Sequence, residues 1–357
     1  MNNNLVDVFI KLVQIDSVTG YEKKITDFLV SYLKGMVDIV KKDSYGNVYA
    51  RIDGEGKPIF FASHMDTVEP GRGIKPKIKK GYIVSDGTTI LGADNKVAIA
   101  GMLEIARLIK KSKVLHRPVE FLFTLSEEVG NYGAINFDYS MLRSKLGYCF
   151  DTSRPVGTIV DASPFYERFD IIIKGKAAHA SLPEQANNVL FFLASLLKEV
   201  PLGQLDEDTI LNIGVLQSGH VRNTIPGELT FKGEIRSFVE SSLLHHKEIV
   251  LKKIHQLVKK YNMQIVCEFV RENPGYKHTD KESLRAIKNI EKKMSLCGLK
   301  PKIESVWGVS DANIFNERGL ICFNLGDGTE HPHTTNERIS ISQLMTLARL
   351  MTQLIMP

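Results

Sequence analysis

Histidine and acidic residues, the side chains that bind metal ions or move protons, follow four predicted strands of this sequence. The strands are predicted at 58–63, 119–125, 147–150 and 320–325. The side chains that follow them are His64, Asp66, Glu127, Glu128, Asp151, His331 and His333, and Asp94 begins a predicted helix. Because ligands of an open α/β sheet bind outside the carboxyl ends of its strands, we expect these groups to meet at one edge.

The chemistry of these side chains suits divalent metal ions. Each residue taken alone has an ordinary explanation: a packed or surface histidine, a helix N-cap at Asp94, solvated charge at Glu127 and Glu128, or a turn at Asp151. Their common position favours a metal site over these explanations. Imidazole and carboxylate are ligands that zinc, manganese and cobalt accept, and two histidines with three carboxylates suit two ions that share a bridging carboxylate.

The elements that must position these groups alternate between helices and strands in the first part of the chain. Apolar spacing predicts helices at 3–14, 21–35 and 94–113, and strands at 46–52, 58–63, 82–84 and 119–125. Some of these strands are apolar on both faces. The pattern is typical of a largely parallel sheet covered by helices.

The middle of the chain has a different pattern. Strand 167–174, helix 186–199, strands 209–217 and 228–238, helix 240–260 and strand 264–271 give the order β-α-β-β-α-β, which is that of a ferredoxin-like domain. A helix at 281–297, the strand at 320–325 and a helix from Ser342 then follow. We therefore predict a discontinuous catalytic domain, 1–165 plus 273–357, and an inserted domain, 166–272.

Composition excludes several classes of protein. Of 357 residues, 43% are hydrophobic and 24% are charged, values typical of a globular protein. The net charge of +5 is spread along the chain without a basic stripe, so we expect no nucleic-acid partner. No apolar run approaches the roughly 18 residues of a membrane span, and the first residues lack the pattern of a signal peptide, so we expect a cytoplasmic protein without membrane contact.

Five motifs, taken in order, resemble those of a known family. They are His64-x-Asp66, Gly92-Ala93-Asp94-Asn95-Lys96, Ser126-Glu127-Glu128-Val129-Gly130, Asp151 and His333-Thr334-x-x-Glu337. The sequence resembles the M20-type di-zinc metallopeptidases, and within them most closely the peptidase T (tripeptide aminopeptidase) branch. The match extends over nearly the whole chain. It implies a zinc-peptidase-like α/β fold, a mostly parallel sheet flanked by helices, with an inserted α+β ferredoxin-like lid that also serves dimerisation.

The resemblance implies a set of ligands for two divalent ions, zinc above all, with manganese or cobalt as alternatives. Asp94 would bridge both ions. His64 and Asp151 would complete one site, and Glu128 and His333 the other. The pattern His-Thr-x-x-Glu favours His333 over its neighbour His331. The family also has a cis peptide after the bridging aspartate, which we expect between Asp94 and Asn95.

Two acidic residues are implied to act in catalysis. Asp66, two residues after His64, would accept the other ring N–H of that histidine and so orient it. Glu127, which has no metal assigned to it, would be the general base. It would take the proton from a metal-bridging water, which attacks as hydroxide, and return the proton to the leaving amine.

Three substrate-binding residues of the inserted domain rest on the resemblance alone. His179, in Gly175-Lys176-Ala177-Ala178-His179-Ala180, matches a lid histidine that stabilises the oxyanion, often from the partner subunit of a dimer. Asn223 and Arg236 also lie in lid motifs and would bind a peptide carbonyl or terminal carboxylate. Without the resemblance, His179 would pass as a surface histidine and Arg236 as an ordinary strand residue.

A further loop, Ser310-Asp311-Ala312-Asn313, echoes one that lines the substrate pocket in the family. Val309 and Thr152 stand where the family commonly has glycine. These two departures leave the candidate ligands intact. They lie in loops expected to line the substrate pocket, so they bear on the substrate length and side-chain preference that the resemblance implies.

The leading hypothesis is a cytoplasmic metallo-aminopeptidase, a hydrolase of short peptides in peptide catabolism that resembles a tripeptidase and forms a homodimer. An amidohydrolase that deacylates N-acyl amino acids is an alternative on the same scaffold. A free substrate amine distinguishes them, since the peptidase requires it and the deacylase rejects it. The third alternative, a non-catalytic binding protein, conflicts with the joint presence of five candidate ligands and Glu127.

Overall fold

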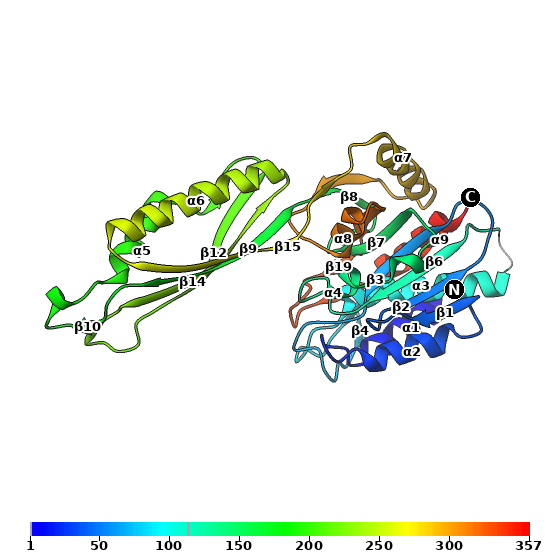
Figure 1. Cartoon of the computed structure of the whole chain (residues 1–357). Helices are drawn as coiled ribbons and strands as arrows, with labels where there is room; N and C mark the ends of the chain where they lie inside the picture. Colours follow the sequence, from blue (N-terminus) through cyan, green and yellow to red (C-terminus); the bar gives the residue numbers. More distant parts are fainter. Residues whose placement is uncertain (1, 113–114) are drawn as a thin grey trace. The chain divides into compact units, whose positions relative to one another are not determined.

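The computed structural model describes residues 2–112 and 115–357 and divides them into two compact units. Unit 1 comprises Met1–Ala162 and His278–Pro357, and unit 2 comprises Ser163–Lys277 (Figure 1). The boundaries expected from the sequence, 166 and 272, lie inside unit 2. The predicted end of one helix, Lys113, lies outside the described residues. Among the described residues, no helix combines the length and apolar composition that crossing a membrane requires.

Unit 1 is built on a sheet in the order β1-β2-β6-β3-β7-β18-β8, with β17 beside β8. The strands are β1 (Ile39–Lys42), β2 (Val48–Ile52), β3 (Ile59–His64), β6 (Val119–Thr124), β7 (Leu146–Thr152), β8 (Thr158–Ser163), β17 (Lys302–Ser305) and β18 (Ile321–Gly326). The central strands β6, β3, β7 and β18 are parallel, and antiparallel pairs lie toward the edges. The predicted fold class, a mostly parallel sheet flanked by helices, is confirmed.

The helices of unit 1 and a small second sheet complete the unit. The helices are α1 (Asn2–Val13), α2 (Lys23–Leu33), α3 (Ala93–Ser112), α4 (Tyr132–Ile135), α7 (Lys281–Leu296), α8 (Asp311–Glu317) and α9 (Ile341–Ile355), with a 3-10 turn at Tyr139–Met141. The small sheet has the order β19-β20-β5-β4, formed by β19 (Thr329–Glu330), β20 (Arg338–Ser340), β5 (Tyr82–Val84) and β4 (Lys77–Lys79).

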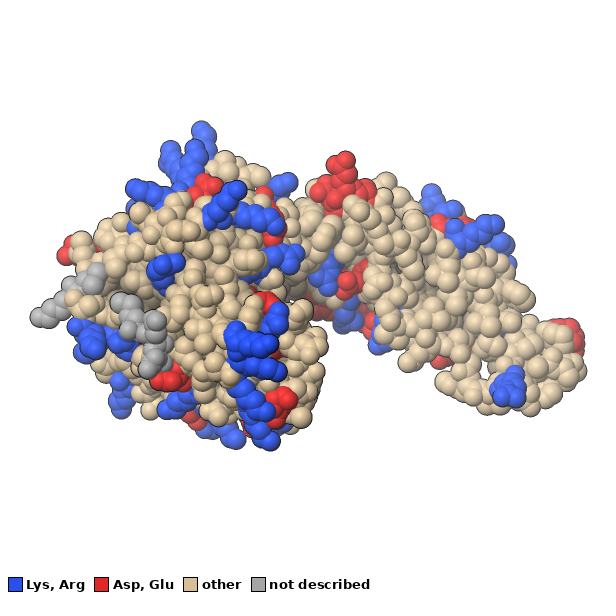
Figure 2. Space-filling view, turned by 180° about the vertical axis from the view of Figure 1, so that it is seen from behind, with Lys and Arg blue, Asp and Glu red and all other residues tan. Residues whose placement is uncertain are grey.

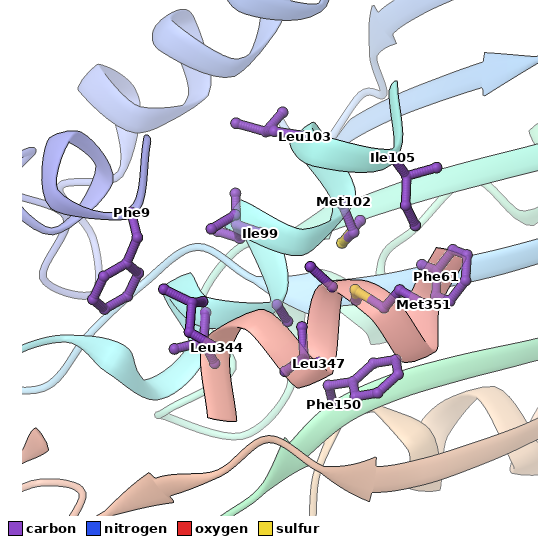
Figure 3. Packing of buried hydrophobic residues seen from close by; sticks show 14 of the residues in the cluster. Phe9, Phe61, Ile99, Met102, Leu103, Ile105, Phe150, Leu344, Leu347 and Met351 are labelled. Atoms are coloured by element: carbon purple, nitrogen blue, oxygen red, sulfur yellow. The ribbon is translucent and has the colours of Figure 1, made fainter. Parts of the chain in front are cut away.

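Two faces of the main sheet bury different aromatic residues because successive side chains of a strand point to opposite faces. Phe61 of β3 contacts Phe121, Tyr148 and Phe150, with ring centroids 5.6 to 6.4 Å apart. The helices α3 and α9 pack together in the same core, which includes Phe61, Phe150, Met102 and Met351 (Figure 3). The neighbouring residue Phe60 instead meets Phe315 of α8, at 5.4 Å.

Unit 2 has the β-α-β-β-α-β order that the sequence predicts. Its elements are β9 (Phe165–Lys174), β10 (Ala178–His179), a 3-10 turn (Pro183–Gln185), α5 (Val189–Glu199), β11 (Gly203–Gln204), β12 (Thr209–Ser218), β13 (Thr224–Ile225), β14 (Glu228–Ser237), α6 (Glu240–Lys260), β15 (Gln264–Asn273) and β16 (Tyr276–Lys277). Its main sheet is antiparallel with the order β11-β12-β14-β9-β15. Buried side chains of α5 and α6 join those of this sheet in a separate core.

Charged residues are dispersed over the face of the molecule that Figure 2 shows. Figure 2 shows lysine and arginine in several separate groups on one face of the molecule, with acidic residues between them. Much of unit 2 on this face carries neither sign of charge (Figure 2). The net charge of +5 is therefore not concentrated in a single basic patch on this face.

We predict that Gly147→Ala destabilises unit 1. Gly147 lies in register with Phe60 on the adjacent strand, and an added Cβ would stand 2.2 Å from the Phe60 ring. Phe60 is fully buried against Phe315 and has no room to move, so overpacking should lower the free energy of unfolding by about 1–3 kcal/mol. Urea unfolding followed by fluorescence of the single tryptophan, Trp307, measures the change.

Gly308→Ala is the matched control for this substitution. An added Cβ at Gly308 meets no atom within 4 Å, and its φ is not positive. The control should unfold at nearly the same urea concentration as the unaltered chain. Equal midpoints for the two variants would contradict the packing argument.

Candidate metal centre

The carboxyl ends of the parallel strands bring the predicted ligands together at one edge of the sheet. Three groups of side chains have ligand atoms within 4.8 Å of one another, which is close enough to share an ion. They are His64 with Asp94 and Asp151, Asp94 with Glu128 and His333, and His64 with Glu127 and Glu128. The donor set, imidazole with carboxylate, fits the divalent ions that the sequence indicates.

Asp94 lies between two of these groups and directs one oxygen at each. Its Oδ1 is 3.1 Å from Nε2 of His64, and its Oδ2 is 3.5 Å from Nε2 of His333. The same ring nitrogens lie 3.5 Å from Oδ1 of Asp151 and 3.0 Å from Oε1 of Glu128. A carboxylate with two such neighbourhoods is suited to be shared by two cations.

The electrostatics of this cluster favour positive charge. The pKa of His333 is raised to about 10 by hydrogen bonds to Asp94 and Glu128. Burial lowers the pKa of His64, but the Asp151 charge and hydrogen bonds to carboxylates raise it well above its ordinary value. Burial raises the pKa of Asp94, yet hydrogen bonds from both histidines lower it overall. The cluster that stabilises protons on two imidazoles would stabilise bound cations by the same field.

The cis peptide expected between Asp94 and Asn95 is present. Asn95 is fully buried, and its Nδ2 donates to the carbonyl of Phe150 at 2.8 Å and to Oδ1 of Asp151 at 2.6 Å. Its own Oδ1 accepts a hydrogen bond from Ser63 at 3.0 Å. Asn95 thus orients Asp151, a role that the sequence analysis missed although the residue stands inside a quoted motif.

Asp66 contacts the His64 ring and also the turn that carries Glu127 and Glu128. Nδ1 of His64 lies 3.0 Å from the backbone oxygen of Asp66 and 3.5 Å from its carboxylate. The carboxylate accepts the backbone N–H groups of Glu127 and Glu128, at 3.0 and 3.2 Å, and the hydroxyl of Thr19, at 2.8 Å. The nearer partner of the His64 ring is therefore the backbone oxygen, and the carboxylate holds the turn that carries Glu127 and Glu128.

Glu337 holds the chain that leads into Asp94. Its Oε2 accepts the N–H groups of Leu91 and Gly92, both at 2.7 Å, and its Oε1 accepts the N–H of Asp94 at 3.0 Å. The side chain is 1% exposed, and burial, reinforced by the Asp94 charge, raises its pKa to about 7. Because Glu337 lies four residues after His333, one loop presents a candidate ligand and anchors another.

The two histidines of that loop occupy different places. His333 is part of the cluster described above, whereas His331 lines a cavity of about 740 Å³ beside it. Lys79, Lys80 and Arg338 contribute positive charge to the same cavity. The structure thus brings His333 to the candidate ligands and leaves His331 at the edge of the neighbouring cavity.

The three candidate substrate-binding residues belong to unit 2 and fall into two places within it. The β10–β13 pair sets His179 opposite Thr224, which brings Asn223 to 3.5 Å from the His179 ring. Arg236 lies opposite Tyr166 near the other end of β9 and β14, stacks on that ring and bonds to Glu234. Ten-residue strands therefore separate His179 and Asn223 from Arg236.

Comparison with known proteins identifies the family of the chain. The model of peptidase family M20/M25/M40 matches residues 60–356. The chain belongs to this family. The M20 chain is therefore a hydrolase that acts on peptide bonds, and the resemblance stated from its motifs is confirmed.

Its similarity to individual proteins extends over nearly its whole length. It is 34% identical to the aminopeptidase PepT of Bacillus cereus ATCC 10987 in a solved structure, with 99% of this chain and 98% of that chain covered and a TM-score of 0.92. A tripeptidase structure from Staphylococcus aureus subsp. aureus Mu50 gives 33% identity, the same coverage and a TM-score of 0.96. The protein YqjE of Bacillus subtilis strain 168 is 32% identical, with coverage of 98% and 97%.

We predict that Glu337→Gln weakens metal binding. An amide offers one acceptor oxygen where the carboxylate offers two, and its NH₂ group would face a backbone N–H of the loop before Asp94. Displacement of Asp94 should lower the affinity for at least one ion by roughly 10–100-fold. Titration of the metal-free protein against a competing chelator measures this affinity.

Glu330→Gln is the control. The Glu330 carboxylate contacts Arg338 within the small sheet, and it accepts none of the three backbone N–H groups that Glu337 holds. Its metal affinity should equal that of the unaltered chain. Unchanged affinity in Glu337→Gln, with the fold intact, would show that the three N–H contacts do not control the position of Asp94.

Proposed function

We propose that this M20 peptidase is a metal-dependent aminopeptidase that hydrolyses short peptides, tripeptides among them. The observation that carries the proposal is the position of Asp94, with one oxygen toward each of two histidine-containing groups and the half-buried Glu127 beside them. The similarity to an aminopeptidase and to a tripeptidase supports the choice of substrate class.

Two divalent ions fit the donor set, and zinc is the proposed metal, with manganese and cobalt accepted by the same ligands. His64, Asp94 and Asp151 would hold one ion, and Asp94, Glu128 and His333 the other. When bound, the ions would supply Lewis acidity toward the scissile carbonyl and the attacking water.

Glu127 is proposed to move the proton. Burial raises the pKa of this carboxylate well above its ordinary value, the His64 charge opposes that shift, and the charges of Asp151 and Asp311 add to it. A carboxylate with increased proton affinity suits a general base near neutral pH. Glu127 takes a proton from the attacking water and returns it to the nitrogen of the leaving amine. Asp66 serves this step by holding the backbone N–H groups of Glu127 and Glu128.

Unit 2 is proposed to act as the lid and to supply groups for the substrate. His179 and Asn223 would stabilise negative charge on the peptide carbonyl, and Arg236 would bind a carboxylate. The chain enters unit 2 at Ser163, next to the start of β9, whereas His179 lies beyond the far end of this ten-residue strand. His179 therefore lies roughly 33 Å along the strand from this connection, and its proposed role in the site of a partner subunit rests on the resemblance to the family.

A homodimer is part of the proposal, and unit 2 has a surface that fits one. Within the described part of the chain, β11 covers β12 only at Ile210 and Leu211, so the rest of its outer edge has no neighbouring strand. Val215 and Leu216 on this segment are exposed. An exposed apolar strand edge can pair with its copy across a two-fold axis. A cytoplasmic location completes the proposal and agrees with four free cysteines.

The substrate class can be tested with matched peptides. We expect the purified protein to cleave free-amine tripeptides in a manner abolished by chelator and restored by zinc, manganese or cobalt, and to leave the N-acetylated forms intact. Glu127→Ala should keep both ions while kcat falls by about 10²–10⁴-fold. Mass spectrometry of the products and elemental analysis of the protein give both answers.

Other outcomes would each remove a part of the proposal. Cleavage of N-acyl amino acids alone would identify a deacylase. No chelator-sensitive hydrolysis of any peptide or N-acyl amino acid would exclude both enzymatic activities. Normal turnover by Glu127→Ala would exclude this residue as the general base.

The role of the partner subunit can be tested by mixing two inactive variants. His179→Ala and Glu127→Ala homodimers should each be nearly inactive. After mixing and subunit exchange, a heterodimer has one site with both groups intact if His179 acts across the dimer. About a quarter of the unaltered activity should return, because half of randomly mixed dimers are heterodimers with one complete site each.

No recovery of activity, with heterodimers demonstrated by differently tagged subunits, would show that His179 acts within its own chain. Gel filtration of the unaltered protein gives the oligomeric state on which the mixing experiment depends. A monomer would exclude the dimer and the contribution across it.

A further inference from the structure

The turn that follows Glu127 places the buried side-chain amide of Asn131 against the Glu127 carboxylate. The backbone N–H groups of Gly130 and Asn131 both donate to the carbonyl of Glu127, at 3.0 and 2.9 Å. Asn131 has a φ of 57°, in the left-handed region that asparagine adopts more readily than most residues. Its side chain is 1% exposed. The local backbone thus directs the Asn131 side chain inward, toward Glu127.

The amide of Asn131 connects the half-buried Glu127 to a buried carboxylate, that of Asp311. Its Nδ2 donates to Oε1 of Glu127 at 3.0 Å and to Oδ1 of Asp311 at 3.1 Å. Asp311 is 3% exposed and is the first residue of α8. Its Oδ2 accepts the hydroxyl of Thr124, the last residue of β6, at 2.5 Å. A continuous chain of hydrogen bonds therefore leads from the main sheet to the proposed base.

The start of α8 also reaches the other side of the metal centre. Nδ2 of Asn324 donates to Oγ of Ser310 at 3.2 Å and to the carbonyl of Asp151 at 2.9 Å. The N–H of Asp151 donates back to Oδ1 of Asn324 at 2.9 Å. Ser310 and Asp311 are adjacent, so one helix start constrains both Glu127 and a candidate metal ligand.

We propose that Asn131 is a positioning residue for Glu127 and that Asp311 fixes the Asn131 amide in the orientation this requires. The inference rests on the proposed role of Glu127 as general base. Because Asn131 holds Oε1, and no described residue donates to Oε2, the free oxygen Oε2 is the one that takes the proton. A fixed carboxylate keeps the base within reach of the attacking water, and small misplacements of such groups cost much of the rate.

Asn131→Gly tests the proposal with little disturbance of the backbone. Glycine also adopts a positive φ, so the substitution removes the amide and leaves the turn conformation accessible. We expect two bound ions, a moderate fall in Tm because two carboxylates lose a donor, and a KM within about threefold, while kcat falls by roughly 10–100-fold. Asn136→Gly is the matched control, because the exposed Asn136 amide bonds, among the described residues, only to the backbone of Tyr132. It should leave kcat unchanged.

A double-mutant cycle shows whether Asn131 acts through Glu127. In the Glu127→Ala background, Asn131→Gly should cause no further loss of kcat, since the group that it positions is already absent. Asp311 provides an independent variant. Asp311→Asn can still accept from Asn131 and donate to Thr124, so it should retain most of the kcat that Asp311→Ala loses.

Each remaining outcome overturns a definite statement. Full kcat in Asn131→Gly, with Glu127→Ala inactive, would overturn the positioning role and leave the proposed function standing. Normal turnover by Glu127→Ala would instead overturn the proposed function. Equal losses in both backgrounds, loss of metal or a large fall in Tm would show a merely structural role. Equal activities of Asp311→Ala and Asp311→Asn would remove Asp311 from the chain of hydrogen bonds.

Discussion

The density of carboxylates at one partly buried sheet edge is the constraint on which the rest of this structure depends. Carboxylates in a poorly solvated place repel one another and lose hydration, so each needs a compensating partner. The structure divides them into two layers. Those of the outer layer, Asp94, Asp151 and Glu128, face histidines and the space for cations. Those behind, such as Asp66 and Glu337, accept hydrogen bonds from backbone N–H groups.

The inner layer explains how the outer layer keeps its affinity for cations. Because neutral donors satisfy Asp66 and Glu337, these carboxylates orient the ligand loops without competing for a metal ion. The fully buried side chain of Lys96 adds a positive charge close to the carboxylates of the inner layer. Its ammonium group donates to the carbonyl of Ile15 at 2.9 Å. Burial lowers its pKa to about 8, and the charges of Glu337 and Asp66 oppose that shift. The negative charge of Asp94, Asp151 and Glu128 in the outer layer therefore remains available to attract bound cations.

Aromatic packing on both faces of the sheet holds the strand behind the cluster in place. Phe60 and Phe61 are adjacent in β3 and bury opposite faces of the sheet, which ties the strand leading to His64 into both layers of helices. Helix α3, which begins at the cluster, packs on α9 where Gly101 meets Met351. Unit 2 has a separate core, formed by its own sheet and the helices α5 and α6.

The sequence by itself determined which strands end in ligand residues, the β-α-β-β-α-β order of unit 2 and the family, because burial periodicity and motif spacing are local. It predicted β5 of the small sheet at 82–84 but missed the other three strands of that sheet, and also β1, β8, β17 and α8; most of these elements are shorter than six residues. Only the tertiary structure decided what orients the ligands. Glu337 bonds to an N–H 243 residues away, and Asn131 to a carboxylate 180 residues away. Such contacts leave no periodic pattern, because folding alone brings the two partners together.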